Sequence, residues 1–220
     1  MQPYVVPFVL YLLATSLAAN WPAAYPVSYA AIVVACSIVT ARLLRGRGIV
    51  APHRHVMDAV VVGLVGIGLW IGLSNLHLES HLTTVLPEWL RPGARVAFNP
   101  FEELDHAWQA WLFVAFRIVG LSVIVPIAEE LFWRGFLARW LIAADWEKFP
   151  LGRFTPFSFA AVTALFTLAH PEWFAAAVYC TLINGLLIWK RDLWRCIVAH
   201  GISNLVLAVY VLATESWWLW

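Results

Sequence analysis

Two adjacent carboxylates, Glu129 and Glu130, lie at the end of an apolar stretch that begins near Ala107. Arg134 follows Glu130 by four residues, so on a helix these two side chains share a face and are able to form an ion pair. Glu129 is rotated by about 100° from that face and is left for another task. A charge at the centre of a membrane helix costs about 2.5–3.5 kcal/mol on insertion scales, so the cluster indicates a functional site. The alternative is a structural ion pair with one additional buried acid.

Two later apolar stretches carry imidazole and amide groups. His170 ends a stretch that begins at Thr155, and in the last stretch His200 and Asn204 share a helix face at a spacing of four residues. Taken alone, His170 is typical of a histidine at a membrane interface, and a His/Asn pair is able simply to bridge two helices by hydrogen bonds. Together with the acidic motif, however, these groups form a polar set on three apolar segments. Within lipid, the nearest available partners for such groups are one another.

The chemistry that this set favours is hydrolysis. A carboxylate beside a histidine is able to hold and deprotonate a water molecule, and a second histidine with an asparagine amide is able to stabilise the oxyanion that forms on a carbonyl group. Glu129, His170 and His200 would equally supply three ligands for a catalytic zinc ion, and the sequence leaves both mechanisms open. The chain has no His-Glu-x-x-His motif, no Gly-x-Ser-x-Gly motif and no pair of membrane aspartates. These absences argue against zincin, serine and aspartyl proteases.

The composition places these residues in a membrane protein. Of the 220 residues, 62% are hydrophobic and 12% are charged, against about 25% charged in soluble domains. Apolar stretches close to the length of a membrane span recur along the chain. We therefore predict an all-α, polytopic transmembrane helical bundle with a conical or cavity-forming core, folded as a single integral membrane domain over residues 1–220. The net charge of +1 gives no reason to expect a nucleic-acid partner.

About seven spans, within a range of six to eight, account for the apolar stretches: 4–19, 25–44, 57–78, 107–128, 155–170, 173–189 and 193–213. The fourth is expected to continue past Arg134. The first and fifth are short for a hydrocarbon core of about 30 Å, so each could lie partly at the interface. A short interfacial helix over 82–90 is also predicted, limited by Pro87. In the third span, Gly68 and Gly72 form a Gly-x-x-x-Gly pair that suits close helix packing, either within the chain or in a dimer.

The basic residues predict how the bundle is oriented. In a seven-span arrangement, three connections on one side of the membrane carry ten of the fourteen Lys and Arg residues: Arg42, Arg45, Arg47, Arg54, Arg139, Lys148, Arg153, Lys190, Arg191 and Arg195. The positive-inside rule then predicts a cytoplasmic N-terminus and an external C-terminus. The compact size is compatible with a bacterial source, and we expect the protein in the inner (plasma) membrane.

Three motifs in order resemble the CPBP family of intramembrane proteases, which contains the CAAX-type prenyl endopeptidases and bacteriocin-processing and immunity relatives. The motifs are Glu-Glu-x-x-x-Arg at 129–134, Phe-x-x-x-His at 166–170 and His-x-x-x-Asn at 200–204. The likeness extends over residues 107–213, which would form the family-like catalytic core. The segment before this core is similar to the exosortase-associated bacterial subgroup.

The resemblance implies a role for each motif residue. Glu129 would activate water together with His170, and His200 with Asn204 would form the oxyanion side of the site. Glu130 and Arg134 would support them. The sequence departs from the motif pattern at Pro171, which follows the histidine directly and is expected to end or kink the helix there.

The leading hypothesis is therefore a CAAX-type membrane endopeptidase, dependent on glutamate or on a metal, that hydrolyses a peptide bond of a membrane-associated peptide or protein substrate. A second hypothesis is a non-catalytic immunity or assembly partner that retains the protease fold. A third is a transporter in which Glu129, Glu130 and the histidines relay protons. The lipid bilayer is the surrounding partner in all three, and the sequence sets neither the substrate nor the oligomeric state.

Overall fold

The computed structural model describes residues 1–88, 91 and 97–220, and all regular structure in this part of the chain is helical. The α-helices are α1 (Gln2–Ala18), α2 (Tyr25–Leu44), α3 (Met57–Ser74), α4 (Glu79–Val85), α5 (Pro100–Glu103), α6 (Ala107–Val119), α7 (Val125–Glu130), α8 (Ala138–Trp140), α9 (Pro156–Leu168), α10 (Trp173–Lys190) and α11 (Leu193–Thr214). Short 3₁₀ turns are η1 (Pro22–Ala24), η5 (Trp146–Lys148) and η6 (Trp217–Leu219). The helix predicted over 82–90 overlaps α4, and residues 89–90 lie outside the described residues.

Five helical segments of the described chain are long and apolar enough to cross a membrane: Pro22–Leu44, Met57–Ser74, Ala107–Trp140, Trp173–Lys190 and Leu193–Thr214. They coincide with five of the predicted spans and confirm the all-α membrane bundle. The two spans predicted to be short correspond to α1 and α9, which have 17 and 13 residues. At 1.5 Å per residue these helices reach only about 25 Å and 20 Å. Whether either crosses the bilayer stays a prediction.

The third candidate span is one continuous rod that twice changes its hydrogen-bonding pattern. Between α6 and α7 lies a π-helical segment, η3 (Gly120–Ile124), and a second, η4 (Leu131–Leu137), joins α7 to α8. Pro126, near the start of α7, has no N–H to donate to the preceding turn, and a local π turn relieves this defect. Short π segments occur frequently at functional sites. Here they lie on either side of Glu129 and Glu130.

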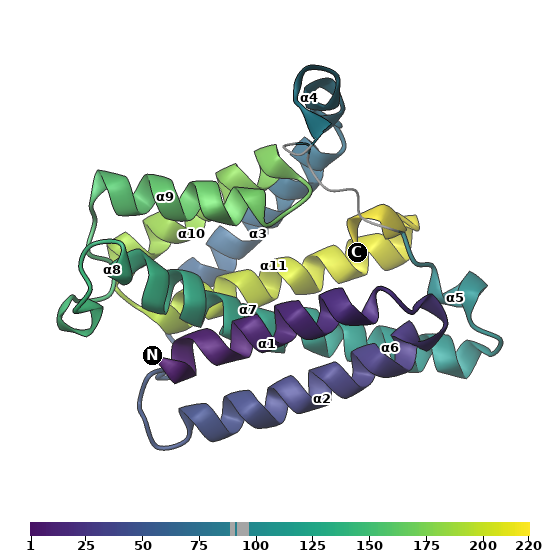
Figure 1. Ribbon diagram of the computed structural model, residues 1–220, viewed down its shortest axis with the longest axis horizontal. Coiled ribbons are helices and arrows are strands. Elements are labelled where there is room, and N and C mark those ends of the chain that lie inside the picture. Colours follow the sequence, from purple (N-terminus) through teal and green to yellow (C-terminus); the bar gives the residue numbers. More distant parts are fainter. Residues whose placement is uncertain (89–90, 92–96) are drawn as a thin grey trace.

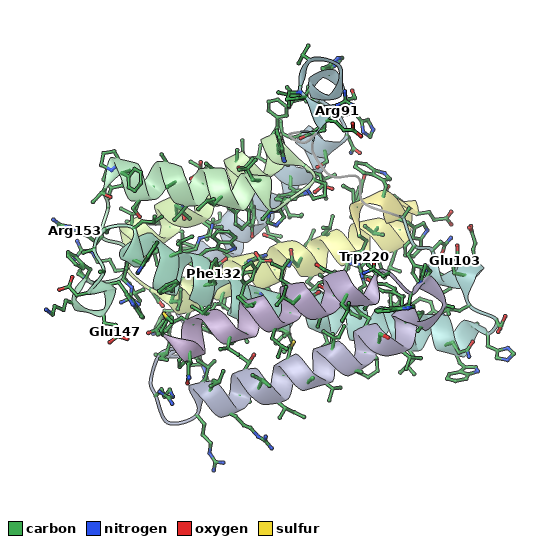
Figure 2. The ribbon with its side chains drawn as sticks, in the orientation of Figure 1. Arg91, Glu103, Phe132, Glu147, Arg153 and Trp220 are labelled. Atoms are coloured by element: carbon green, nitrogen blue, oxygen red, sulfur yellow. The ribbon has the colours of Figure 1, made fainter. Side chains whose placement is uncertain are left out.

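The helices enclose this rod on several sides (Figure 1). In the figure α1 runs beside α2 and crosses α7, while α9 and α10 lie together above α11. α3 packs against both α10 and α11, and α11 also contacts η3 and α7. Phe132 of η4 faces α1 (Figure 2), where its ring stacks on Phe8 with centroids 4.5 Å apart. The central rod is thus covered by the N-terminal helix as well as by the later helices.

Close helix packing depends on glycines other than the predicted pair. A Cβ atom at Gly63 of α3 would lie 2.5 Å from the backbone oxygen of Ala199, and one at Gly66 would lie 2.8 Å from the ring of Tyr179. Around Gly68 and Gly72, by contrast, nothing lies within 4 Å of such an atom. The predicted Gly-x-x-x-Gly pair therefore makes no close contact within the chain, because it lies on a different face of α3 from Gly63 and Gly66. A role of that pair in a dimer stays a prediction.

The three basic connections gather at one end of the bundle, on the left in Figure 1. The ring of His53 lies 2.6 Å from a carboxylate oxygen of Asp192, which joins the connection after α2 to the one after α10. The N-terminal amine lies 3.8 Å from Glu147, in the connection after α8. Glu147 and Arg153 are found at this same end in Figure 2. The clustering agrees with the predicted side assignment, and which side of the membrane this end faces stays a prediction.

Candidate active site

The predicted ion pair between Glu130 and Arg134 is present and fully buried. The guanidinium donates to Glu130 Oε1 at 3.1 Å, and both side chains have 0% exposed surface. Arg134 also donates to Asn184 Oδ1 at 3.1 Å and to Cys180 Sγ at 3.3 Å, and it lies 5.0 Å from the centroid of the Phe166 ring. The cation is therefore held from α10 and α9 as well as from its own helix.

His200 joins this pair from α11. Its Nδ1 lies 2.9 Å from Glu130 Oε1, so this one oxygen accepts from both Arg134 and His200. Because an ionised carboxylate only accepts, the proton of this bond belongs to Nδ1 of the imidazole. The ring is buried and meets Tyr179 edge to face, with centroids 5.7 Å apart. Glu130 is thus the acid that orients and electrostatically supports His200.

Glu129 has different surroundings from its neighbour. Its Oε2 is buried and accepts no hydrogen bond in the described part of the chain. Glu130 pairs with Arg134 and His200, whereas Glu129, directly before it, forms no ion pair within the described residues. A buried acceptor without a donor is costly, and a water molecule or a substrate N–H would satisfy it. The predicted difference between the two glutamates is therefore present in the geometry.

His170 follows α9 in the turn before Pro171. The helix ends at Leu168, two residues earlier than the predicted span, as expected from the proline. His170 Nδ1 lies 2.8 Å from the backbone oxygen of Phe166, which can only accept, so Nδ1 carries a proton. The imidazole stacks on the Phe166 ring at 4.3 Å and meets Trp70 at 5.6 Å.

One cavity of about 180 Å³ brings the four predicted catalytic residues together. Glu129, His170, His200 and Asn204 all line it. Asn204 is held by a bond of 2.7 Å from its amide nitrogen to the backbone oxygen of Leu121, in η3. The other lining residues are mainly aromatic and aliphatic: Tyr11, Ile67, Trp70, Leu121, Val125, Phe166, Tyr179, Ser203, Leu207, Leu219 and Trp220. Glu130 and Arg134 lie outside this wall, where they support it.

Sequence reasoning missed several polar contacts around the cavity. Tyr179 donates to Ser203 Oγ at 3.0 Å, and Ser203 lies 2.9 Å from the backbone oxygen of Gly63. Asn184, the partner of Arg134, also donates to Thr163 at 3.3 Å. The sequence feature that could have revealed these contacts is the presence of single polar residues in the middle of long apolar helices. These contacts tie α3, α9, α10 and α11 around the site.

The predicted zinc ligands are Glu129, His170 and His200. Three protein ligands about 2.0–2.2 Å from the metal are typical of catalytic zinc. Within the described residues, no three His, Cys, Asp or Glu side chains are grouped so that they could hold a metal ion. Nδ1 of each histidine bonds to an oxygen, of Phe166 in one case and of Glu130 in the other, and this arrangement is compatible with a metal on Nε2. It is the spacing of the side chains in the described residues that does not fit a three-ligand zinc site.

The fold and the cavity define an integral membrane protein with a buried polar site enclosed by helices. The family model for type II CAAX prenyl endopeptidases, described as Rce1-like, matches residues 109–206. This match confirms the resemblance to CPBP membrane proteases over residues 109–206 and supports a membrane CAAX-type endopeptidase in general. The match includes all three motifs. No curated protein and no solved structure matches the chain.

Proposed function

We propose that this protein is an intramembrane endopeptidase that hydrolyses a peptide bond of a membrane-associated substrate within the cavity. The observation that carries the proposal is the meeting of Glu129, His170, His200 and Asn204, from three separate segments, around one cavity of about 180 Å³. A carboxylate, two imidazoles and an amide supply a base, an acid and hydrogen-bond donors. The Rce1-like domain at 109–206 supports the same class of reaction.

In the first step, Glu129 acts as the base. Its carboxylate accepts a proton from a water molecule, and the water oxygen bonds to the carbonyl carbon of the scissile peptide bond. His170, which lines the same cavity, helps to position this water. The product is a tetrahedral intermediate whose carbonyl oxygen now carries the negative charge. Burial of the site strengthens each of these interactions, since little solvent screens them.

In the second step, His200 and Asn204 stabilise that oxyanion. Nδ1 of His200 is bonded to Glu130, and a protonated ring would donate its Nε2–H to the oxyanion. Asn204 uses one amide N–H on Leu121 and directs the second toward the same oxygen. The proton taken up by Glu129 then passes to the leaving amine as the C–N bond breaks. One peptide bond and one water molecule are consumed, and a carboxylate and an amine are released.

The proposed mechanism is metal-free. Each of its steps uses only side chains of this chain, and the described residues lack a group of three metal-ligating side chains. Zinc held by Glu129, His170 and His200 stays the alternative prediction. A metal content near one atom per chain in purified protein, together with inhibition by strong chelators, would favour that alternative.

The decisive experiment compares membrane proteomes of cells that carry the protein with either Glu129→Ala or the matched control Glu147→Ala. Glu147 is exposed and lies outside the cavity, so its replacement should leave processing unchanged. We expect at least one membrane protein to acquire an unprocessed terminus only in the Glu129→Ala strain. Purified protein should then cleave the corresponding peptide, and Glu129→Ala should not. Cleavage that persists in folded Glu129→Ala protein would refute the proposal.

A further strain, which carries Glu129→Gln, tests the second hypothesis. A non-catalytic immunity or assembly partner requires the fold and not the base, so Glu129→Gln would retain full cellular function. A protease loses function with this substitution, because an amide does not accept the proton from water. We further propose a cytoplasmic N-terminus in a bacterial inner membrane, supported by the basic connections at one end of the bundle. Accessibility of labels placed at Met1 and in the 141–155 connection tests this orientation.

A further inference from the structure

A second intramembrane arginine, Arg117 of α6, lies in an aromatic environment. Its guanidinium donates to the Tyr25 hydroxyl at 2.6 Å and lies over two rings, 5.2 Å from the centroid of Tyr29 and 5.5 Å from that of Trp220. Cation–π contacts of this kind hold a guanidinium in place. They do not neutralise its charge.

Arg117 has no acidic partner in the chain. All thirteen Asp and Glu residues fall within the described residues, and across that part of the structure none forms an ion pair with Arg117. The contrast is Arg134, which has the carboxylate of Glu130 at 3.1 Å. A guanidinium has five N–H donors, and the hydrogen bond to Tyr25 uses one. An ionisable residue within the membrane normally faces an ion or ligand pathway or a counter-ion, so an anion from outside the chain is the missing partner.

The contacts of Arg117 select the kind of anion. Its guanidinium reaches the hydroxyl of Tyr25, the first residue of α2, so it lies toward the end of the bundle where α2 begins. The active-site cavity is only one side-chain layer away: Trp220, which covers Arg117, also lines the cavity, and Tyr11 of the cavity wall is 3.2 Å from Tyr29 by their hydroxyls. A peptide in that cavity is therefore within reach of Arg117. Figure 2 shows Trp220 beside the end of α11.

We propose that Arg117 binds a carboxylate of the peptide substrate, which passes between Tyr11 and Trp220 while the scissile bond lies at Glu129. The proposal rests on the proposed peptidase function and adds a determinant of substrate choice. Arg117 precedes Glu129 by twelve residues, about 18 Å along the helix. An extended peptide covers that distance in about five residues at 3.3–3.6 Å each. The carboxylate is therefore either a C-terminus or an acidic side chain roughly five residues beyond the cleaved bond.

The test measures peptide binding to the full chain in nanodiscs, with Glu129→Gln present so that no peptide is cleaved. The probe is dansylated hexaleucine, either as the free acid or as the C-terminal amide, detected by energy transfer from tryptophan to dansyl. A second pair of amidated peptides ends in an aspartyl or an asparaginyl residue and distinguishes an acidic side chain from a C-terminus. Arg117→Gln removes the charge and Arg117→Lys keeps it. Arg42→Gln, at the exposed end of α2, is the matched control.

We expect one carboxylate peptide to bind at least about tenfold more tightly than its uncharged counterpart, as is typical of a hydrogen-bonded charge. Arg117→Gln should abolish this preference without weakening binding of the amide, while Arg117→Lys and Arg42→Gln should keep it. Equal binding of the charged and uncharged peptides, or a preference that survives Arg117→Gln, overturns the proposal. The retained preference of Arg117→Lys separates loss of charge from misfolding. Because binding is measured without turnover, the result does not depend on whether Glu129 is the catalytic base.

Discussion

Replacing Arg134 with methionine should be among the most destabilising single changes in this protein. Methionine fills a similar volume but leaves Glu130 buried without its cation, and both side chains have no exposed surface. Breaking a buried pair by removing one partner costs about 3–5 kcal/mol. His200 still donates to the carboxylate, so we expect the lower end, about 3 kcal/mol. For a chain of this length each 1 kcal/mol shifts the melting temperature by about 2–4 °C, which predicts a decrease of roughly 6–12 °C.

The double variant Glu130→Gln/Arg134→Met provides the sharper measurement. With both charges removed, no buried ion remains unpaired, so the double variant should melt well above Arg134→Met and close to the parent protein. A coupling energy of about 2–3 kcal/mol between the two positions is expected for residues in direct contact. Thermal unfolding of the four proteins in the same detergent, followed by intrinsic tryptophan fluorescence, gives the complete cycle.

The control is the exposed pair of Lys148 and Asp145. Lys148 Nζ lies 3.0 Å from Asp145 Oδ2, a distance similar to that in the buried pair, but the two side chains are 78% and 54% exposed. Surface pairs contribute little because solvent and salt screen them, and Lys148→Met should leave the melting temperature nearly unchanged. If Arg134→Met has an equally small effect, or if the double variant shows the simple sum of the two single effects, the ion pair is not what stabilises this part of the bundle.

Three further predictions concern the cavity and the packing around it. Glu129→Gln should lower the cleavage rate by about 10²–10⁴-fold with an unchanged melting temperature, and a normal rate in a peptide-cleavage assay would contradict its role as base. Peptide cleavage should continue in the presence of a strong zinc chelator; complete inhibition that is reversed by added zinc would instead establish the metal-dependent mechanism. Gly63→Ala should destabilise the protein by about 1–3 kcal/mol because its methyl group would meet the backbone of Ala199 at 2.5 Å, whereas Gly68→Ala should be tolerated; equal melting temperatures would show that α3 is free to shift.

The membrane helices could be predicted because length and apolar composition alone decide whether a segment suits a bilayer. The same reasoning identified α1 and α9 as short. Glycine spacing was less informative. A Gly-x-x-x-Gly pattern gives a smooth helix face but not the direction in which that face points, and the close contacts of α3 fall at Gly63 and Gly66. Which face looks inward depends on neighbouring helices that the local sequence does not specify.

Within the site, spacing predicted the contact that lies on a single helix and missed those that join different helices. Glu130 and Arg134 are four residues apart, so helical geometry brings them together. The bond from His200 to Glu130 joins residues seventy positions apart, and no periodicity encodes it. Asn184 was missed for the same reason. All four catalytic residues predicted from the three motifs nevertheless line the cavity. They could be recognised because a polar group inside an apolar helix is conspicuous in the sequence.

The π-helical segment at Gly120–Ile124 joins α6 to α7 and sets the rotation of one helix relative to the other about their common axis. A π turn contains one more residue than an α turn, so it acts as an insertion that the helix has absorbed. Deleting one residue there would restore ordinary α-helical bonding and keep α6 and α7 close to their present relative rotation, because the π turn and the α turn that replaces it each make about one revolution. Arg117 would then keep its aromatic environment and Glu129 its place. A one-residue deletion elsewhere between Arg117 and Glu129 has no such extra residue to remove and would rotate the two side chains apart by about 100°.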